Sequence, residues 1–179
     1  FNWTGGDLRS GNSGTVVNQT GGVFNDFPSA SISNAYGGTS ASFTNNGIYN
    51  KVGTGTTLVS LPFTNSNGTV SASTGTLQFG SSFTQTGGTL AVHNGATLQF
   101  NNGLNLAAGF LLGPGNVVGN VTSSAVVSPS VGTPSATATP GQLNIFGDLS
   151  LTSSAFTLFE IGGVAPGISY DFLNVSGST

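Results

Sequence analysis

Apolar and polar residues alternate along most of this chain. Leu77 and Phe79 are separated by a polar residue, and the same pattern recurs at 90–92, 98–100 and 104–106. Period-two alternation places one face of a strand in a core and the other in water, whereas a helix needs apolar residues every three to four positions. Clusters of Gly, Asn and Ser interrupt these runs, where turns need positive φ or side-chain-to-backbone bonds. The pattern predicts short β-strands joined by turns.

The alternating segments repeat, and two independent series of residues carry the repeat. The first has a step of 20 and consists of Phe43, Phe63 and Phe83. The second has a step of 21 and pairs Leu77 with Leu98 and Phe79 with Phe100. A unit this short cannot bury its own apolar face, but stacked copies share one continuous core. The repeat therefore predicts an all-β protein, a parallel β-solenoid with about 20–21 residues per coil and roughly eight or nine coils.

Stacking of equivalent residues predicts two internal ladders, meaning columns of like side chains along the solenoid axis. Phe43, Phe63 and Phe83 would form an aromatic ladder. Asn45 and Asn65, two residues after the first two Phe residues, would exchange amide hydrogen bonds at a turn. Ordinary turn chemistry without a ladder is the alternative for the two Asn residues.

The period weakens towards the C-terminus. We expect a single solenoid domain over 1–179, with regular coils at 1–125 and longer coils at 143–179. Between them, 126–142 is rich in Pro, Ser and Thr. Proline cannot donate to a β-ladder, so an extended loop is predicted there.

Composition narrows the functional classes. Gly, Ser, Thr and Asn make up just over half of the 179 residues, and only 4% are charged. Two basic residues, Arg9 and Lys51, cannot neutralise a run of phosphates, so nucleic acid is not an expected partner. The chain has no Cys, so disulfides and thiolate metal sites are excluded. The longest apolar stretch, near 104–112, is about half of what a membrane span needs.

Few residues offer catalytic chemistry. Asp7 and Asp26 are 19 residues apart, about one coil, and could stack on one face near Arg9 or Lys51. Two solvated turn residues are the preferred interpretation, because the third carboxylate that a catalytic or Ca²⁺ site would need is missing near residue 46.

The remaining titratable residues suggest no site either. Asp148, Glu160 and Asp171 could gather a cation, but charge pairing or turn capping is favoured because the Ca²⁺-binding nonapeptide pattern is absent. His93 is the only histidine and is expected in a solvated turn. No cofactor or metal is predicted.

Several surface features are candidate binding sites. Five sequons occur, at Asn2, Asn18, Asn67, Asn120 and Asn174. Thr residues at 54–56 and 74–76 are one coil apart, but the array is expected to stop at Ala96, which argues against an ice-binding face. Four aromatic residues could stack on sugars if their rings were exposed. Burial of these rings in the core is at least as good an expectation. The four residues are Trp3, Tyr36, Tyr49 and Tyr170.

Several segments are similar to repeats of large bacterial surface proteins. They are Phe1–Gly6, Gly75–Phe79, Gly113–Val117 and Tyr170–Gly177. These segments resemble autotransporter-like and haemagglutinin-like β-helix adhesins, and the resemblance covers nearly the whole chain. It implies a right-handed parallel β-helix outside the cell, with an adhesion, matrix or fibre role.

Both ends of the chain fall where a repeat is expected to be under way. Either the sequence is a fragment of a longer protein, or subunits stack end to end into a filament, because open solenoid edges pair with another chain. We therefore expect a non-enzymatic extracellular structural protein. Its expected partner is a second copy of the same chain, and surface glycans are the second candidate partner. A carbohydrate-binding or carbohydrate-cleaving module on the same scaffold is the alternative.

Overall fold

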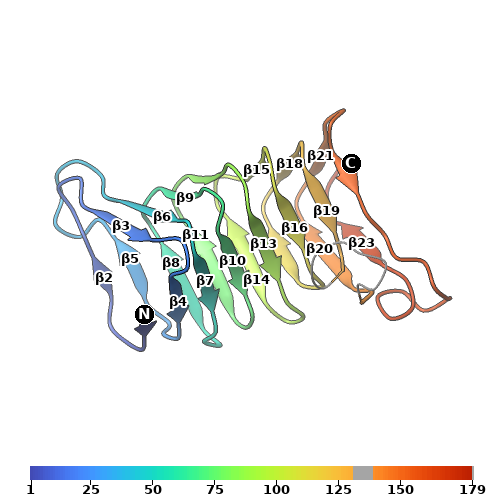
Figure 1. The fold of residues 1–179 in the computed structure, drawn as a ribbon, viewed down its shortest axis with the longest axis horizontal. Helices are drawn as coiled ribbons and strands as arrows, with labels where there is room; N and C mark the ends of the chain where they lie inside the picture. The colour runs from blue at the N-terminus through green and yellow to red at the C-terminus, as the bar shows by residue number, and fades with distance from the viewer. Residues whose placement is uncertain (131–138, 179) are drawn as a thin grey trace.

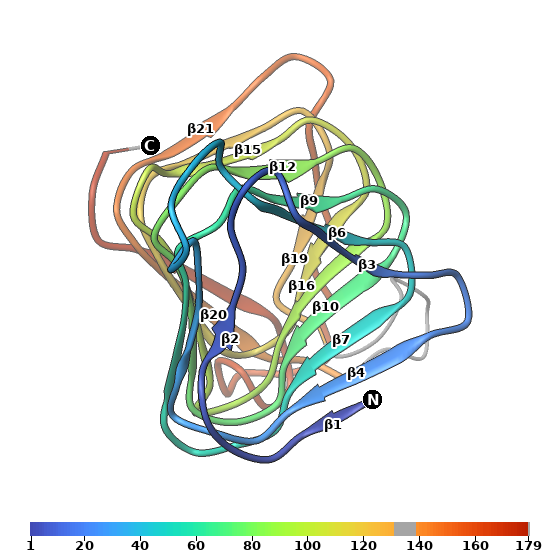
Figure 2. The same ribbon diagram turned by 90° about the vertical axis from the view of Figure 1, so that its left-hand side faces the viewer.

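The chain forms a right-handed parallel β-helix. The computed structural model describes residues 1–130 and 139–178, and within them 23 strands form three parallel sheets without any helix. Each sheet takes every third strand of the chain, so three successive strands make one coil (Figure 1). Seen from the N-terminal end, the chain circles clockwise as it recedes (Figure 2). The predicted fold class is confirmed.

The strands of each sheet follow one another along the axis. Sheet A contains β1 (Asn2–Trp3), β4 (Val23–Asp26), β7 (Ile48–Lys51), β10 (Thr69–Ala72), β13 (Thr89–Val92), β16 (Phe110–Leu112), β19 (Val126–Ser128) and β22 (Phe156–Thr157). Sheet B contains β2 (Leu8–Arg9), β5 (Ser31–Ser33), β8 (Thr56–Val59), β11 (Thr76–Phe79), β14 (Thr97–Phe100), β17 (Asn116–Val118), β20 (Gln142–Phe146) and β23 (Phe172–Val175). Sheet C contains β3 (Thr15–Asn18), β6 (Ser42–Asn45), β9 (Phe63–Asn65), β12 (Phe83–Gln85), β15 (Leu104–Leu106), β18 (Val121–Ser123) and β21 (Leu149–Leu151).

The two repeat series set the register between coils. Phe43 pairs with Phe63, and Phe63 with Phe83, in sheet C. The same holds in sheet B for Leu77 with Leu98 and for Phe79 with Phe100. All of these residues are buried. Because the register is fixed by identical side chains, each apolar position lies over its counterpart and the inner face stays apolar along the stack.

Aromatic rings fill the middle of the solenoid and stack from coil to coil. The ring centroids of Phe43 and Phe63 are 4.8 Å apart with planes 11° from parallel, and those of Phe63 and Phe83 are 5.6 Å apart at the same angle. Phe79 and Phe100 stack at 5.2 Å in sheet B. Phe63 also meets Phe79 edge to face at 5.1 Å, which interlocks the two columns.

Coil length varies more than the sequence repeat indicates. Equivalent residues are 27 apart between Asn18 and Asn45, 20 between Asn45 and Asn65, 28 between Asn116 and Asn144, and 30 between Asn144 and Asn174. The coils at 143–178 are thus long, as expected, but those within 1–45 are long too, which the expectation of regular coils over 1–125 missed. Because longer coils use more residues, a chain of this length makes fewer turns of the solenoid. The three sheets accordingly have eight, eight and seven strands.

The loop predicted at 126–142 is shorter than expected at both ends. Val126–Ser128 forms β19, and Gln142 begins β20. Alternating apolar residues continue into both segments, and their strand pairs extend sheets A and B. The middle of the predicted loop, 131–138, lies outside the described residues. Among those that are described, no helix has the length and apolar character to cross a membrane.

Candidate functional site

An amide ladder runs inside the solenoid at the ends of the sheet C strands. Asn18 Nδ2 donates to Asn45 Oδ1 at 2.8 Å, Asn45 Nδ2 donates to Asn65 Oδ1 at 2.9 Å, and Asn65 Nδ2 donates to Gln85 Oε1 at 2.9 Å. The predicted ladder at Asn45 and Asn65 is confirmed. It extends one coil further in each direction than expected. Gln85 could have been found because it follows Phe83 as Asn65 follows Phe63.

Two further amide ladders lie on outer faces and were not predicted. On sheet A, Asn25 donates to Asn2 at 2.8 Å and Asn50 donates to Asn25 at 3.2 Å. On sheet B, the members are Asn116, Asn144 and Asn174, with amide bonds of 3.1 and 3.3 Å. Three sequon residues, Asn2, Asn18 and Asn174, therefore have side chains engaged in ladders. The amides of the three ladders thus hold coils in register rather than face a ligand.

Asp26 and Lys51 form a buried charged pair, contrary to the expectation that Asp26 is a solvated turn residue. They are direct neighbours on β4 and β7, and neither side chain is exposed. Lys51 Nζ lies 3.4 Å from Asp26 Oδ1 and donates to the Pro28 carbonyl at 2.8 Å. Tyr49 Oη donates to Asp26 Oδ2 at 2.8 Å, and Thr57 Oγ1 donates to Oδ1 at 2.9 Å. Every polar atom of the pair is thus bonded within the core.

Burial dominates the protonation equilibria of this cluster. It raises the pKa of the Asp26 carboxyl, and the hydrogen bond from Tyr49 and the charge of Lys51 oppose that rise. Burial, reinforced by the adjacent carboxylate, also raises the pKa of Tyr49 well above its ordinary value. Asp26 and Tyr49 therefore favour their neutral forms more than exposed groups would.

Asp7 does not join Asp26, so the possible carboxylate pair is not formed. Asp7 lies exposed before β2 and accepts hydrogen bonds from the Ser31 backbone N–H at 2.9 Å and hydroxyl at 3.0 Å. Arg9 is 3.4 Å away. The Ser31 bonds, followed by Arg9, lower the pKa of Asp7. Asp7 is thus an exposed residue, as the preferred interpretation held, and it bonds to Ser31 at the start of β5 in the next coil.

A second acidic cluster joins Glu160 and Asp171 near the C-terminal end. Asp171 is buried and accepts hydrogen bonds from the backbone N–H groups of Gly141 at 2.8 Å and Glu160 at 3.0 Å. The Ser130 hydroxyl is 2.7 Å from Asp171 Oδ2 and also contacts Glu160 Oε2. The hydrogen bond to Asp171 raises the pKa of Glu160 to about 7, and the same bond helps to lower the pKa of Asp171.

The acidic cluster holds turns together, as the turn-capping interpretation predicted. Asp171 caps the segments at Gly141 and Glu160, while Asp148 accepts from the Ser178 backbone N–H at 2.7 Å. Asp148 is not part of the Glu160–Asp171 pair. No group of three potential metal ligands occurs in the described part of the chain. The carboxyl groups of Glu160 and Asp171 are in contact, so they are closer than the roughly 5–9.5 Å that separates the two catalytic carboxyl groups of a glycosidase.

Stability should depend on the proton shared by Glu160 and Asp171. A raised pKa for Glu160 means that the folded state binds the proton more tightly, so stability falls as pH rises from 4.5 to about 7. The lowered pKa of Asp171 acts oppositely, and its stabilisation is lost as pH falls below 3.8. We expect the melting temperature, followed by circular dichroism, to decrease as pH rises through the first window.

The variant Glu160→Gln keeps a hydrogen-bond donor beside Asp171 but removes the titration. Its melting temperature should vary less between pH 4.5 and about 7 than that of the wild type. Comparing the two curves separates Glu160 from Asp26, whose raised pKa acts in the same direction. Parallel curves would show that the Glu160–Asp171 proton does not contribute.

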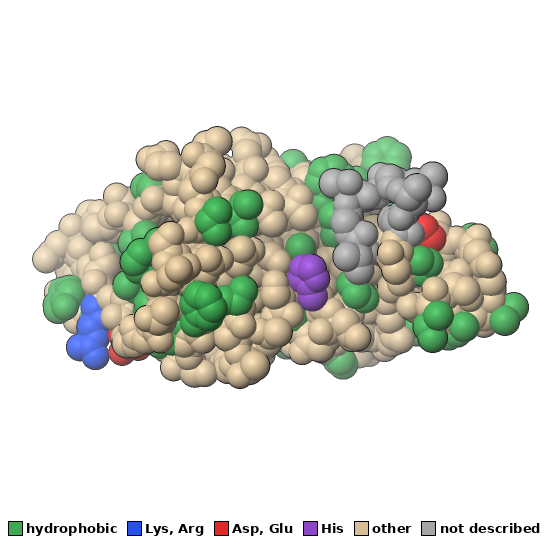
Figure 3. Space-filling view, turned by 60° about the horizontal axis from the view of Figure 1, so that its bottom comes forward, with side chains coloured by type: hydrophobic (Ala, Val, Ile, Leu, Met, Phe, Trp, Pro, Cys, Tyr) green, Lys and Arg blue, Asp and Glu red, His purple; other side chains and the backbone are tan. Residues whose placement is uncertain are grey.

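Charged groups are sparse on the surface, and most of the face in Figure 3 consists of backbone and uncharged polar side chains. His93 is exposed, as predicted. It borders a depression of about 370 Å³ on sheet A, lined also by Ser71, Leu112 and Pro114. No carboxylate lines that depression, so it offers no acid–base pair.

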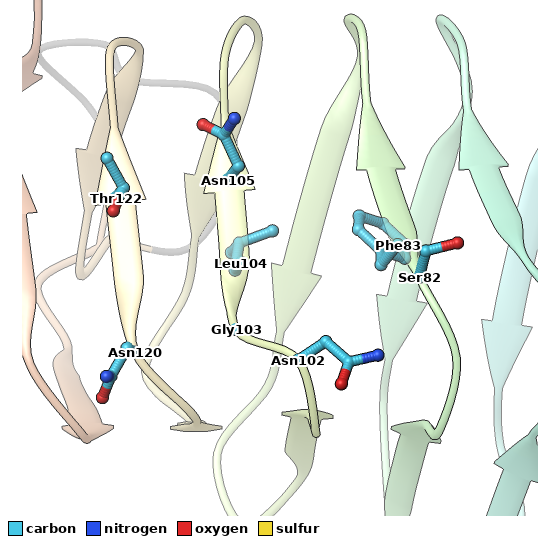
Figure 4. Close-up of a pocket in the computed structure, with 8 residues that line it drawn as sticks. All are labelled: Ser82, Phe83, Asn102, Gly103, Leu104, Asn105, Asn120 and Thr122. Atoms are coloured by element: carbon cyan, nitrogen blue, oxygen red, sulfur yellow. The ribbon is translucent and has the colours of Figure 1, made fainter.

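A depression of about 300 Å³ lies on sheet C, lined by residues of β12, β15 and β18 and the turns between them (Figure 4). Its polar lining comes from uncharged side chains: Ser82, Asn102, Asn105, Asn120 and Thr122. Phe83 and Leu104, which also line it, belong to the buried core. Amides and hydroxyls can hydrogen-bond a neutral ligand, but none of them supplies a nucleophile with a base beside it.

The threonine array was predicted to stop at Ala96, and this is wrong. Ala96 is buried, and Thr97 takes the next outward position, in register with Thr76 and Thr56. Asn116 follows Thr97 in the same column. The column therefore continues as hydroxyls and then amides.

Burial divides the four aromatic residues considered for sugar stacking. Trp3 and Tyr49 are buried in the core. Tyr36 is exposed, and Tyr170 is partly buried.

Comparison of the chain with protein-family models, curated proteins and solved structures found no match. The resemblance to bacterial adhesin repeats therefore stays a prediction.

Proposed function

We propose that this chain is a non-enzymatic structural segment of an extracellular bacterial surface protein, an adhesin or fibre in which the solenoid itself is the functional part. The observation that supports the proposal most is the unbroken in-register stack of three parallel sheets, reinforced by amide ladders inside and outside. Such stacks are rigid and resist proteases. An uncharged surface permits lateral association without electrostatic repulsion.

We further propose that the solenoid continues from one copy to the next. In a following copy placed in line, β1, β2 and β3 would continue sheets A, B and C beyond β22, β23 and β21, the outermost strands at the C-terminal end. A hollow of about 600 Å³ at this end is lined by apolar side chains that include Leu151, Phe159 and Leu173. Covering it with another coil would extend the core, and the resulting head-to-tail contact does not close into a ring.

Two matched variants test this assembly. Phe159 lines the end hollow, whereas Phe146 has a similar exposure, 49% against 44%, but lies on the side of the solenoid in sheet B. We expect the wild type to form elongated particles whose length grows with protein concentration, seen by sedimentation and electron microscopy. Phe159→Asp should leave mainly single subunits, and Phe146→Asp should still assemble.

A wild type that remains a single subunit at high concentration would contradict end-to-end stacking. Equal assembly of the two variants would show that the end hollow is not the contact. Neither substitution should disturb the fold, because both side chains lie outside the aromatic core.

Glycan binding on the same scaffold is the alternative function. It is favoured by the neutral amides and hydroxyls around the sheet C depression in Figure 4, which suit an uncharged polysaccharide. Stacking on sugars needs exposed aromatic faces, and two of the four candidates are buried. Structural assembly therefore remains the better-supported proposal.

A further inference from the structure

The buried Asp26–Lys51 pair brings together the two groups that form an amide. The residues are opposite each other on neighbouring strands, and both side chains point into the core. Tyr49 and Phe24 stack beside them with centroids 4.9 Å apart, and Trp3 is the sheet neighbour of Asp26 on the other side. An amine and a carboxyl group are thus held in contact within an aromatic environment.

Proton transfer within the pair gives the reactive forms of both groups. Removing an ion pair from water is costly, and transfer of one proton from the ammonium to the carboxylate turns it into a neutral amine and a carboxylic acid. A neutral amine is a nucleophile, whereas an ammonium is not. The proton transfer needs no outside base, because Lys51 Nζ and Asp26 Oδ1 are 3.4 Å apart.

The hydroxyl groups around Asp26 prepare its carboxyl carbon for attack. Thr57 donates to Oδ1 at 2.9 Å and Tyr49 donates to Oδ2 at 2.8 Å, so both oxygens are polarised. Donors fixed in this way stabilise the negative charge that develops on oxygen during addition. The Pro28 carbonyl, 2.8 Å from Lys51 Nζ, holds the amine in place. Fixed contact of the reacting groups replaces a bimolecular encounter.

We propose that Lys51 and Asp26 become joined by an intramolecular isopeptide bond. The Nζ lone pair adds to Cγ of the protonated Asp26 carboxyl, the Cγ–O bond to the hydroxyl then breaks, and the hydroxyl leaves with a proton from nitrogen as water. One C–N bond forms and one C–O bond breaks. No oxidation or reduction is involved.

The bond would fasten the first coils of the solenoid to each other. It connects β4 to β7 across 25 residues, in a part of the chain where the coils are longer than the 20-residue coil between Asn45 and Asn65. A covalent tie between coils prevents strand pairs in sheet A from separating one after another under tension. This inference does not depend on the proposed end-to-end assembly.

Two measurements on the wild-type protein test the bond. The intact mass should be lower than the sequence mass by one water molecule. Arg9 and Lys51 are the only trypsin sites, so digestion of the denatured protein should cut after Arg9 but not after Lys51, whose amine is blocked. The resulting peptide 10–179 contains both Asp26 and Lys51 with or without the bond, so a further cut between them, by chymotrypsin after Tyr36, is needed. Tandem mass spectrometry should then find one branched peptide containing both Lys51 and Asp26.

Three variants complete the design. Lys51→Arg keeps a trypsin site and cannot form the bond, so its denatured chain should have the full mass and be cut at both sites. Tyr49→Phe removes the hydrogen bond to Oδ2 and should slow bond formation about a hundredfold. Tyr36→Phe, at an exposed tyrosine, should behave as the wild type.

A wild type with the full sequence mass that is cut after Lys51 overturns the proposal. Loss of water with cleavage after Lys51 overturns it as well, because the dehydration then lies elsewhere. Equal rates for Tyr49→Phe and Tyr36→Phe would overturn the role of the Tyr49 hydroxyl.

Discussion

Replacing Phe63 with Ala should lower the free energy of unfolding by about 4 kcal/mol. The Phe63 ring is buried and stacks on Phe43 and Phe83, while its edge contacts Phe79 and Tyr49. Truncation removes these contacts from three successive coils and leaves a cavity that rigid, stacked strands cannot close. In a chain of this size the melting temperature should fall by about 10 °C.

The change should be measured by urea denaturation followed by circular dichroism. Phe156→Ala is the matched control, because Phe156 is 65% exposed on β22 and should change stability by less than about 1 kcal/mol. A Phe63→Ala variant as stable as this control would mean that the aromatic column does not hold the coils together.

The sequence predicted the middle of the fold well because identical residues recur there at one spacing. Phe63 and Phe83 follow Phe43 at equal steps, and equal steps with period-two alternation leave one register that keeps the apolar side inward. The ladder at Asn45 and Asn65 follows from the same register. The length of the N-terminal coils was not predicted because their turns are longer. Longer turns leave the strand pairing intact but remove the constant spacing between equivalent residues.

The error at Asp26 has the same origin. Counting one 19-residue coil from Asp7 placed Asp26 on a shared outer face, but sheet A pairs it with Trp3 and Lys51 instead. Alternation within the strand was the better guide: Asp26 follows buried Phe24 by two positions, as Lys51 follows buried Tyr49. Both charged side chains therefore point into the core, on the same face of the strand as the aromatic residue two positions earlier.

The turn-capping role of the acidic residues was predicted, but the contacts within the acidic cluster could not be, for a different reason. Ser130 and Asp171 are 41 residues apart, and Gly141 and Asp171 are 30 apart. No repeat connects these positions. Asp171 reaches the other residues because the chain follows an irregular path between β22 and β23. Only the three-dimensional path of the chain shows that Glu160 and Asp171 lie together, which raises the pKa of Glu160.

Replacing Asn65 with Ala should lower the free energy of unfolding by about 3 kcal/mol, nearly as much as loss of the aromatic ring. Asn65 occupies the middle of the inner amide ladder and is fully buried. Its side chain accepts from Asn45 and donates to Gln85 and to the Gly68 carbonyl at 3.1 Å. Alanine leaves those partners without water to replace the lost bonds, and an unsatisfied buried polar group costs about 1–3 kcal/mol.

The control for Asn65→Ala is Asn67→Ala, two residues along the chain at an exposed position. Urea denaturation should show a change below about 0.5 kcal/mol for the control. Equal stabilities would mean that the amide ladder does not help to maintain the stack. A large difference would show that a polar column inside the solenoid fixes the coils as firmly as the apolar one, because each amide must find the next at the correct height along the axis. Slipping one coil by a single residue would break both columns together.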